Sequence, residues 1–213
     1  MTSLYTSPKK TQARDLTVLA FRSSLVGTSR QYWTLAGPCG QDGRVIAGSE
    51  FCWAVQQGLV EPDQFHGVDY CAEVTAQNQT LAQGHWYRGD FLEVMRDQDA
   101  VGDFHPGIIN YDSLVMPAKG TPYFAQVLYL ARHQKDCVVV GNFVTRSRYW
   151  QVSYLDIINL LSQEPLFVEF FRAGNWSLHS QAYCYNGSGK RNTTEMCSVI
   201  FTASPQPTTK EST

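Results

Sequence analysis

Short runs of β-branched or aromatic residues alternate along this chain with longer segments that have helical spacing. This alternation predicts βαβ units and therefore a mainly parallel sheet covered by helices. A continuous apolar run at Cys137–Val140 is typical of a central strand buried on both faces. The strands we expect before the last quarter of the chain are 32–36, 65–69, 108–111 and 137–140, and 86–91 is either a short third strand or its exit loop.

Helices are expected between these strands, at 48–57, 71–83, 121–134 and 154–161, with a short helix from Pro165 to just before Gly174. Ser49 is placed to cap the first helix, and Gly58 stands where a C′ glycine belongs. After the last expected helix, the segments 176–185 and 196–202 resemble strands on either side of a polar turn. This pattern predicts a β-hairpin. The apolar segment 16–26 fits either a helix or a strand.

Length and composition favour one domain. The chain has 213 residues, of which 43% are hydrophobic, enough for a sizeable core over 15–203. The polar ends, 1–14 and 204–213, are expected to be disordered tails. No stretch approaches the roughly 20 apolar residues of a membrane span, and 1–14 lacks a signal-peptide core, so we expect a cytoplasmic protein without membrane contact.

Net charge and cysteine spacing limit the kinds of partner and metal that we expect. A net charge of −2 does not indicate a nucleic-acid binder, although it leaves one open. The 6 cysteines form no CxxC pair and have no histidine at zinc-like spacing, so we expect free thiols and no metal. The sequence also lacks a P-loop, the dinucleotide fingerprint and the hydrolase GxSxG motif.

Asp69 is the first candidate for ligand binding, because it ends the expected second strand. Nucleotide-binding sheets place a hydrogen-bond acceptor for the ribose diol at this edge. The residue lies about 20 positions beyond the start of the first helix, near the spacing that this geometry requires. The alternative is that Asp69 caps the helix that starts at Cys71, and both interpretations stay open.

Five βα units closed by a strand hairpin resemble the class I S-adenosylmethionine-dependent methyltransferases, over roughly residues 32–203. The resemblance implies a Rossmann-like three-layer α/β sandwich with a mostly parallel, seven-stranded sheet and an antiparallel C-terminal β-hairpin. It also implies S-adenosylmethionine as a small-molecule cofactor. The methyl acceptor and the oligomeric state are not evident from the residues.

Two further motifs match this family by position. In Gly89-Asp90-Phe91, after the third strand, the resemblance implies that Asp90 accepts from the adenine amino group and that Phe91 contacts the ring; a simple turn is the alternative. Asn110 and Asp112 end the fourth strand. The resemblance implies that Asn110 touches the methionine part of the cofactor or a substrate. Asp112 is the candidate catalytic base, unless both residues simply end the strand.

The first loop departs from the family pattern. It reads AGPCGQDG, in which Gly37 and Gly40 allow a ligand to approach the backbone closely, but the usual acidic residue and GxGxG-like run are absent. The prolines of the DNA amino-methyltransferase motif are also missing from NYDSLVMP. We therefore expect a methyltransferase-like protein of unknown substrate. The alternative is a catalytically degenerate Rossmann-fold binding or accessory protein, of the kind that viruses or mobile elements encode.

Overall fold

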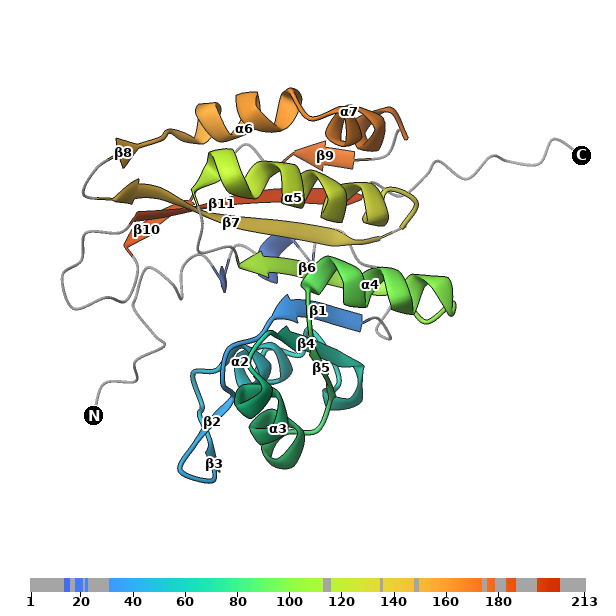
Figure 1. Cartoon of the computed structure of the whole chain (residues 1–213), viewed down its shortest axis with the longest axis vertical. Coiled ribbons are helices and arrows are strands. Elements are labelled where there is room, and N and C mark those ends of the chain that lie inside the picture. Colours follow the sequence, from blue (N-terminus) through green and yellow to red (C-terminus); the bar gives the residue numbers. More distant parts are fainter. Residues whose placement is uncertain are drawn as a thin grey trace, which may run out of the picture.

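A mostly parallel sheet forms the centre of the protein (Figure 1). The computed structural model describes residues 14–15, 18–20, 22, 31–112, 116–134, 136–147, 150–173, 176–178, 183–186 and 195–203. The parallel strands are β1 (Gln31–Leu35), β4 (Phe65–Asp69), β5 (His85–Arg88), β6 (Pro106–Asp112) and β7 (Val138–Ser147).

The C-terminal strands complete the sheet in the opposite direction. β11 (Glu195–Ala203) runs antiparallel to β7, and β10 (Tyr183–Asn186) runs antiparallel to β11. The order across the sheet is β10-β11-β7-β6-β1-β4-β5. This topology confirms the predicted fold class, a Rossmann-like α/β sheet of seven strands with an antiparallel C-terminal pair.

Alternating side chains on the central strands pack against two different helix layers, as the period-2 geometry of a strand requires. Tyr32 and Phe65 belong to the apolar cluster that includes residues of α2 (Glu50–Gln56) and the end of α3 (Ala72–Leu81). Trp33 and Val68 belong to the larger cluster on the other face. β1 and β4 are therefore buried on both faces.

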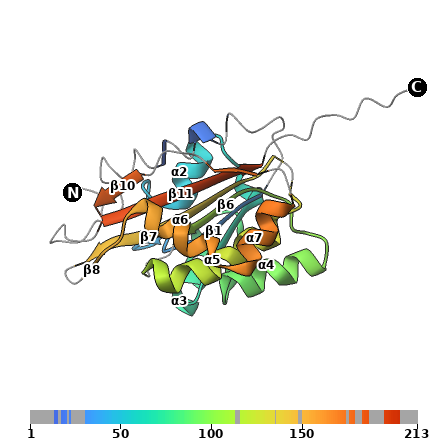
Figure 2. The same cartoon turned by 90° about the horizontal axis from the view of Figure 1, so that it is seen from above.

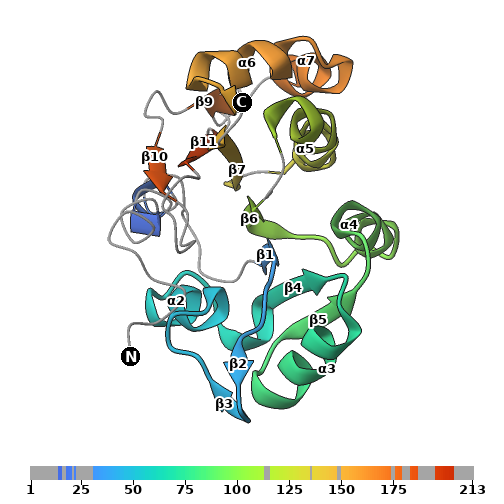
Figure 3. The ribbon, with the colours of Figure 1, turned by 60° about the vertical axis from the view of Figure 1, so that its left-hand side comes forward.

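Four helices build the second layer: α4 (Phe91–Ala100), α5 (Pro117–Ala131), α6 (Tyr154–Ser162) and α7 (Pro165–Arg172). They lie on one side of the sheet and α2 lies on the other (Figures 2 and 3). The caps of α2 agree with the sequence, because Ser49 Oγ accepts a hydrogen bond from the Cys52 amide and Gly58 has a φ of +64°. No helix in the described part of the chain is long and apolar enough to cross a membrane.

Several elements differ from the sequence prediction. Helix α4 was not predicted, although Phe91, Leu92 and Met95 form a buried stripe, because acidic residues dominate the rest of the helix. Strand β7 runs on to Ser147, since pairing with β11 extends it beyond the apolar run. Helix α5 begins at Pro117, four residues early, and continues through Pro122.

The connections also hold short strands that the sequence did not indicate. The first loop contains the antiparallel pair β2 (Gly40–Gln41) and β3 (Arg44–Val45). A short 3₁₀ helix, η1 (Pro62–Gln64), precedes β4. β8 (Trp150–Gln151) pairs with β7. The expected strand 176–185 is instead β9 (Trp176–Leu178) and β10, which pair with opposite ends of β11. In the segment 16–26, residues 18–20 and 22 are helical, and the rest lies outside the described residues.

Candidate functional site

A cavity of about 360 Å³ opens at the carboxyl ends of β1, β4 and β6. From β1 the chain continues to β4 on one side, whereas from β6 it continues to β7 on the other, so the order of the sheet reverses between β1 and β6. Ligands of open α/β sheets bind at such switch points. The lining residues are Arg14, Thr34, Leu35, Ala36, Gly37, Pro38, Ser49, Glu50, Val68, Asp69, Tyr70, Asn110 and Asp112.

The charged groups of this lining are unequal in number. Among the described residues around the cavity, Glu50, Asp69 and Asp112 contribute carboxylates, and Arg14 contributes the one guanidinium. Within a cavity partly removed from water, such an imbalance attracts cations more strongly than it would at an open surface. The described part of the lining has more carboxylates than guanidinium groups.

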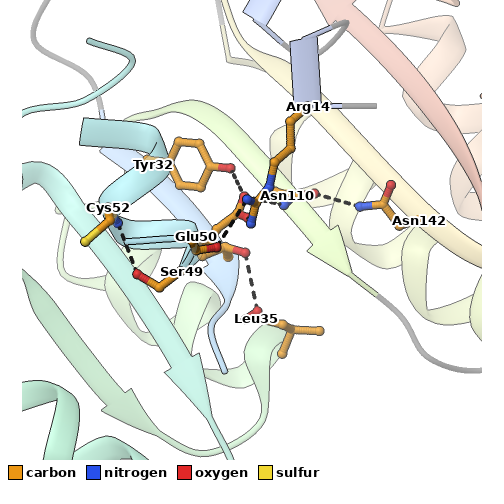
Figure 4. A network of polar contacts seen from close by, with 10 residues as sticks. Arg14, Tyr32, Leu35, Ser49, Glu50, Cys52, Asn110 and Asn142 are labelled. Atoms are coloured by element: carbon orange, nitrogen blue, oxygen red, sulfur yellow. Dashed lines mark hydrogen bonds and ion pairs between the residues drawn. The ribbon is translucent and has the colours of Figure 1, made fainter. Parts of the chain in front are cut away.

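Glu50, in the first turn of α2, is the centre of a polar network (Figure 4). Its Oε1 accepts hydrogen bonds from Tyr32 Oη at 2.5 Å and from Asn110 Nδ2 at 2.9 Å. Its Oε2 pairs with Arg14 Nη2 at 2.6 Å. Burial and then the Glu50 charge raise the pKa of Tyr32 well above its usual value, so the phenol remains a donor to this carboxylate.

Arg14 reaches the cavity from the N-terminal segment (Figure 4). Its side chain is only 10% exposed. Besides Glu50, it donates to the Gly48 carbonyl at 3.3 Å and lies 5.0 Å from the centre of the Trp53 ring. The sequence placed Arg14 at the end of a disordered tail, whereas this side chain is part of the cavity wall.

Asn110 connects the cavity to the far half of the sheet. Its Oδ1 accepts from Asn142 Nδ2 at 2.9 Å, and Asn142 Oδ1 accepts from Ser198 Oγ at 2.5 Å. Both polar groups of Asn110 are thus held by protein partners, Glu50 on one side and Asn142 on the other. Asn110 fixes the position of the Glu50 carboxylate, and its predicted contact with cofactor or substrate remains a prediction.

Asp69 ends β4 at the cavity wall. Its Oδ1 accepts from the Cys71 amide at 2.7 Å, directly before α3, while Oδ2 has no hydrogen-bond partner among the described residues. The two interpretations made from the sequence therefore do not compete for the same oxygen. Oδ1 serves the start of the helix, and Oδ2 is available to a ligand.

Asp90 lies outside the cavity lining and is engaged by the protein itself. Oδ1 accepts from the Leu92 and Glu93 amides at 2.9 and 3.0 Å and from Tyr123 Oη at 2.7 Å, and Oδ2 accepts from Tyr70 Oη at 2.6 Å. Burial raises the pKa of Asp90, but these hydrogen bonds outweigh it and hold the pKa below its usual value. Asp90 is thus the N-cap of α4.

Phe91 also lies outside the cavity lining, whereas Tyr70, directly after β4, belongs to it. Phe91 is fully buried in the core, where its ring packs beside Tyr111. Tyr70 is 64% exposed, lines the cavity and has its hydroxyl fixed by Asp90. The adenine contacts predicted for Asp90 and Phe91 remain predictions, and Tyr70 is the aromatic residue among the described residues of the cavity lining.

The two glycines of the first loop occupy different environments. Gly37 lines the cavity, and no atom lies within 4 Å of where its Cβ would stand. Gly40 pairs with Val45 in the β2–β3 hairpin, where a Cβ would collide with the Leu81 side chain of α3. A Cβ at position 40 would therefore require the Leu81 side chain to shift.

Asp112 lies at the last position of β6 and lines the cavity, as the base hypothesis requires. Residues 113–115, which follow it, lie outside the described residues. The structure thus brings Gly37, Asp69, Asn110 and Asp112 together at one cavity, and places Gly40, Asp90 and Phe91 outside its lining. In the described ranges, no group of three or more His, Cys, Asp or Glu side chains could hold a metal ion.

Comparisons with known proteins give structural likeness only. No family model and no curated protein sequence matches the chain. A TehB-like SAM-dependent methyltransferase from Corynebacterium glutamicum is 13% identical, with a TM-score of 0.45 over 91% of this chain and 95% of that one. A possible exported protein from Bordetella parapertussis is 13% identical, with a TM-score of 0.37 over 90% of this chain and 68% of that one. At these scores neither likeness carries the functional inference, which rests on topology and on the cavity.

Proposed function

We propose that the cavity binds S-adenosylmethionine and that the protein is a methyltransferase of this cofactor class. The observation that carries the proposal is a cavity at the β1/β6 switch point whose described lining residues supply three carboxylates and one guanidinium. S-adenosylmethionine has a sulfonium, an ammonium and one carboxylate, so its net charge is positive. A dinucleotide would instead bring its pyrophosphate against these carboxylates, and the P-loop and GxGxxG sequences that cradle phosphates are absent.

The position of Asp69 supports the same ligand. Its Oδ2 lies at the end of the second parallel strand, where a carboxylate can accept hydrogen bonds from the diol of a bound ribose. The volume of about 360 Å³ falls in the range of roughly 300–1,000 Å³ that is typical of small-molecule sites. Tyr70, at the open side, offers an aromatic face to an adenine ring.

Methyl transfer is an in-line displacement at the sulfonium methyl, so most of the catalysis would come from positioning the acceptor. Asp112 is the candidate general base for an acceptor that must lose a proton. Its place at the end of β6, two residues after the anchored Asn110, holds the carboxylate at the edge of the cavity.

A second candidate function is ligand binding without turnover. Its support is the first loop, where the β2–β3 hairpin takes the place of a glycine-rich turn. Under this alternative the cavity still binds the cofactor, but the protein acts as an accessory or binding protein. Release of S-adenosylhomocysteine during incubation with candidate acceptors separates the two functions, because only the methyltransferase produces it.

The binding step is tested first by isothermal titration calorimetry with S-adenosylmethionine, S-adenosylhomocysteine, NAD and ATP. We expect one site per chain for the two adenosyl amino acids and no saturable heat from NAD or ATP. Preferential binding of NAD or ATP, or no binding of either adenosyl amino acid to folded protein at millimolar ligand, would contradict the proposal.

A further inference from the structure

Arg14 and Glu50 form an oppositely charged pair inside the cavity wall. The two side chains are 10% and 16% exposed, and Nη2 and Oε2 are 2.6 Å apart. Removing two charges from water is costly, and their mutual attraction repays that cost only when further partners satisfy the remaining donors and acceptors. The partners of each group therefore indicate what the pair is arranged to bind.

Two donors hold the Glu50 carboxylate through the same oxygen. Tyr32 and Asn110 both donate to Oε1, and Asn110 is itself anchored by Asn142. The network thus fixes the orientation of the carboxylate and directs Oε2 to the ion pair with Arg14. A carboxylate fixed in this way is suited to binding an ammonium group with little loss of side-chain freedom.

Arg14 is less completely satisfied. A guanidinium has five N–H donors, and the described residues provide acceptors for two of its nitrogens, at Gly48 O and Glu50 Oε2. Its Nε is buried and has no hydrogen-bond partner among the described residues. The planar guanidinium matches a carboxylate through two parallel hydrogen bonds, which an ammonium cannot do.

We infer that Arg14 and Glu50 together recognise the α-amino-acid zwitterion of the ligand, with Arg14 binding its carboxylate and Glu50 its ammonium. The inference rests on the proposed function, which it deepens by assigning ligand specificity to this pair. The first loop has neither a leading carboxylate nor a closely spaced glycine run that could bind the amino-acid end of the ligand. In this chain the Arg14–Glu50 pair binds that end instead. The carboxylate is the single anion of the ligand and Arg14 the one cation among the described lining residues, so the charges are matched group by group.

The test compares three ligands that differ only at this end. S-adenosylhomocysteine has both charged groups, S-adenosyl-3-thiopropylamine lacks the carboxylate, and 5′-methylthioadenosine lacks both. Calorimetry measures their affinities for the full chain and for Arg14→Gln, Arg14→Lys and Glu50→Gln. Arg44→Gln is the matched control, because Arg44 is an exposed arginine of β3 outside the cavity lining.

Each variant has a distinct expected pattern. Arg14→Gln lowers the affinity for S-adenosylhomocysteine at least about tenfold, which corresponds to the loss of one charged hydrogen bond. The affinities for the other two ligands stay within about twofold of those of the unmutated protein. Arg14→Lys, which keeps the charge but not the planar fork, gives a smaller loss. Glu50→Gln weakens S-adenosylhomocysteine and the amine analogue but not 5′-methylthioadenosine, and Arg44→Gln changes none.

Two failures are distinguishable. If the unmutated chain binds S-adenosylhomocysteine but Arg14→Gln and Glu50→Gln weaken all three ligands equally or not at all, the inference is wrong and the proposed function stands. If the unmutated, folded chain binds none of the three ligands, the proposed function fails and the inference falls with it. Should Arg14→Gln not fold in a thermal melt, the Arg14→Lys and Glu50→Gln patterns decide alone.

Discussion

The ends of β4 and β5 have the same local design but different uses. β4 ends on Asp69, and α3 begins three residues later. β5 ends two residues before Asp90, which directly precedes α4. Asp69 gives one oxygen to the backbone and faces the cavity, whereas four donors from the protein engage Asp90. An acidic residue at a strand end is therefore no evidence of ligand binding until its position in the sheet is known.

The difference follows from the strand order. β4 lies beside β1, near the point where the sheet reverses, whereas β5 is the edge strand and is one position further away. At this edge, Tyr123 of α5 reaches across to Asp90 and joins the start of α4 to α5. Asp90, at the edge of the sheet, thus stabilises the helix layer, whereas Asp69, nearer the centre, keeps one oxygen available to a ligand.

The largest expected effect is a loss of stability at acid pH that comes from His66. It has to be measured first, because it would otherwise be added to any effect of the two aspartates in acid. His66 of β4 is 2% exposed and stacks between Trp33 and His85, at ring distances of 4.3 and 4.6 Å. Burial, with a smaller effect from His85, lowers the pKa of His66 from 6.5 to about 3. Between pH 6.5 and 3 the unfolded chain therefore binds a proton that the folded chain does not, so stability is complete above pH 6.5 and falls as the pH drops through this window.

We expect this histidine to cost up to about 5 kcal/mol of unfolding free energy near pH 3, an upper bound taken from the size of the pKa shift. Urea denaturation at pH 7.5, 5.5 and 4 measures it. His66→Phe should remove most of the loss, whereas the exposed His133→Gln should leave it unchanged. An unchanged pH profile in His66→Phe would show that another group causes the loss.

Asp90→Ala should give the largest loss of stability at neutral pH. It removes the N-cap of α4 and the acceptor of two tyrosine hydroxyls, which together are worth about 2–4 kcal/mol. Because Asp90 does not line the cavity, affinity for S-adenosylhomocysteine should fall no more than about threefold, the scale of a sub-kcal/mol change through Tyr70. Thermal melting and calorimetry on the same sample measure both quantities, and a large loss of affinity with intact stability would reverse the comparison.

Asp69→Asn should show the opposite pattern. The asparagine oxygen can still accept from the Cys71 amide, so stability should change by less than about 1 kcal/mol. Loss of the charged acceptor should weaken S-adenosylhomocysteine at least about tenfold. Asp69→Ala serves as the paired variant, because it should lose the same affinity and also about 1 kcal/mol of stability. Equal affinity in all three proteins would remove the ribose role of Asp69.

The smallest expected effect tests the bond between α4 and α5. Tyr123→Phe removes the hydroxyl that donates to Asp90 and accepts from the Leu92 amide, both at 2.7 Å. We expect a loss of about 1 kcal/mol of unfolding free energy and no change in ligand affinity. In an Asp90→Ala background the same substitution should cost less, since the two groups interact directly. Simple additivity of the two losses would show that the hydrogen bond contributes little.

Local sequence signals were sufficient for most of the fold. The strand Phe65–Asp69 was predicted with its observed bounds, and Ser49 and Gly58 mark the ends of α2 as expected. Apolar runs and turn residues act over a few positions, so one sequence reveals them. Helix α4 was missed because its apolar stripe is short and surrounded by charges, and its stability comes from packing against the rest of the core.

The site was less accessible to the same reasoning. Arg14 and Glu50 are 36 positions apart in sequence, and neither belongs to a motif. What brings them together is the packing of Arg14 against α2, where it contacts both Glu50 and Trp53, and this is a tertiary property. Asp69 and Asp112 could be found because strand ends converge at one edge of a parallel sheet, and the same rule selected Asp90, whose partners come from α4, α5 and Tyr70.

The position of the ligand is tested most directly by hydrogen–deuterium exchange with and without S-adenosylhomocysteine. We predict slower exchange in peptides that cover 34–38, 49–50 and 68–71, which line or border the cavity, and unchanged exchange in α6 and α7 on the opposite face. Asp69→Asn at the same ligand concentration should reduce this protection, and Asp90→Asn should not. Ligand binding that protects other segments and leaves the ends of β1 and β4 unchanged would contradict a binding site at the β1/β6 switch point.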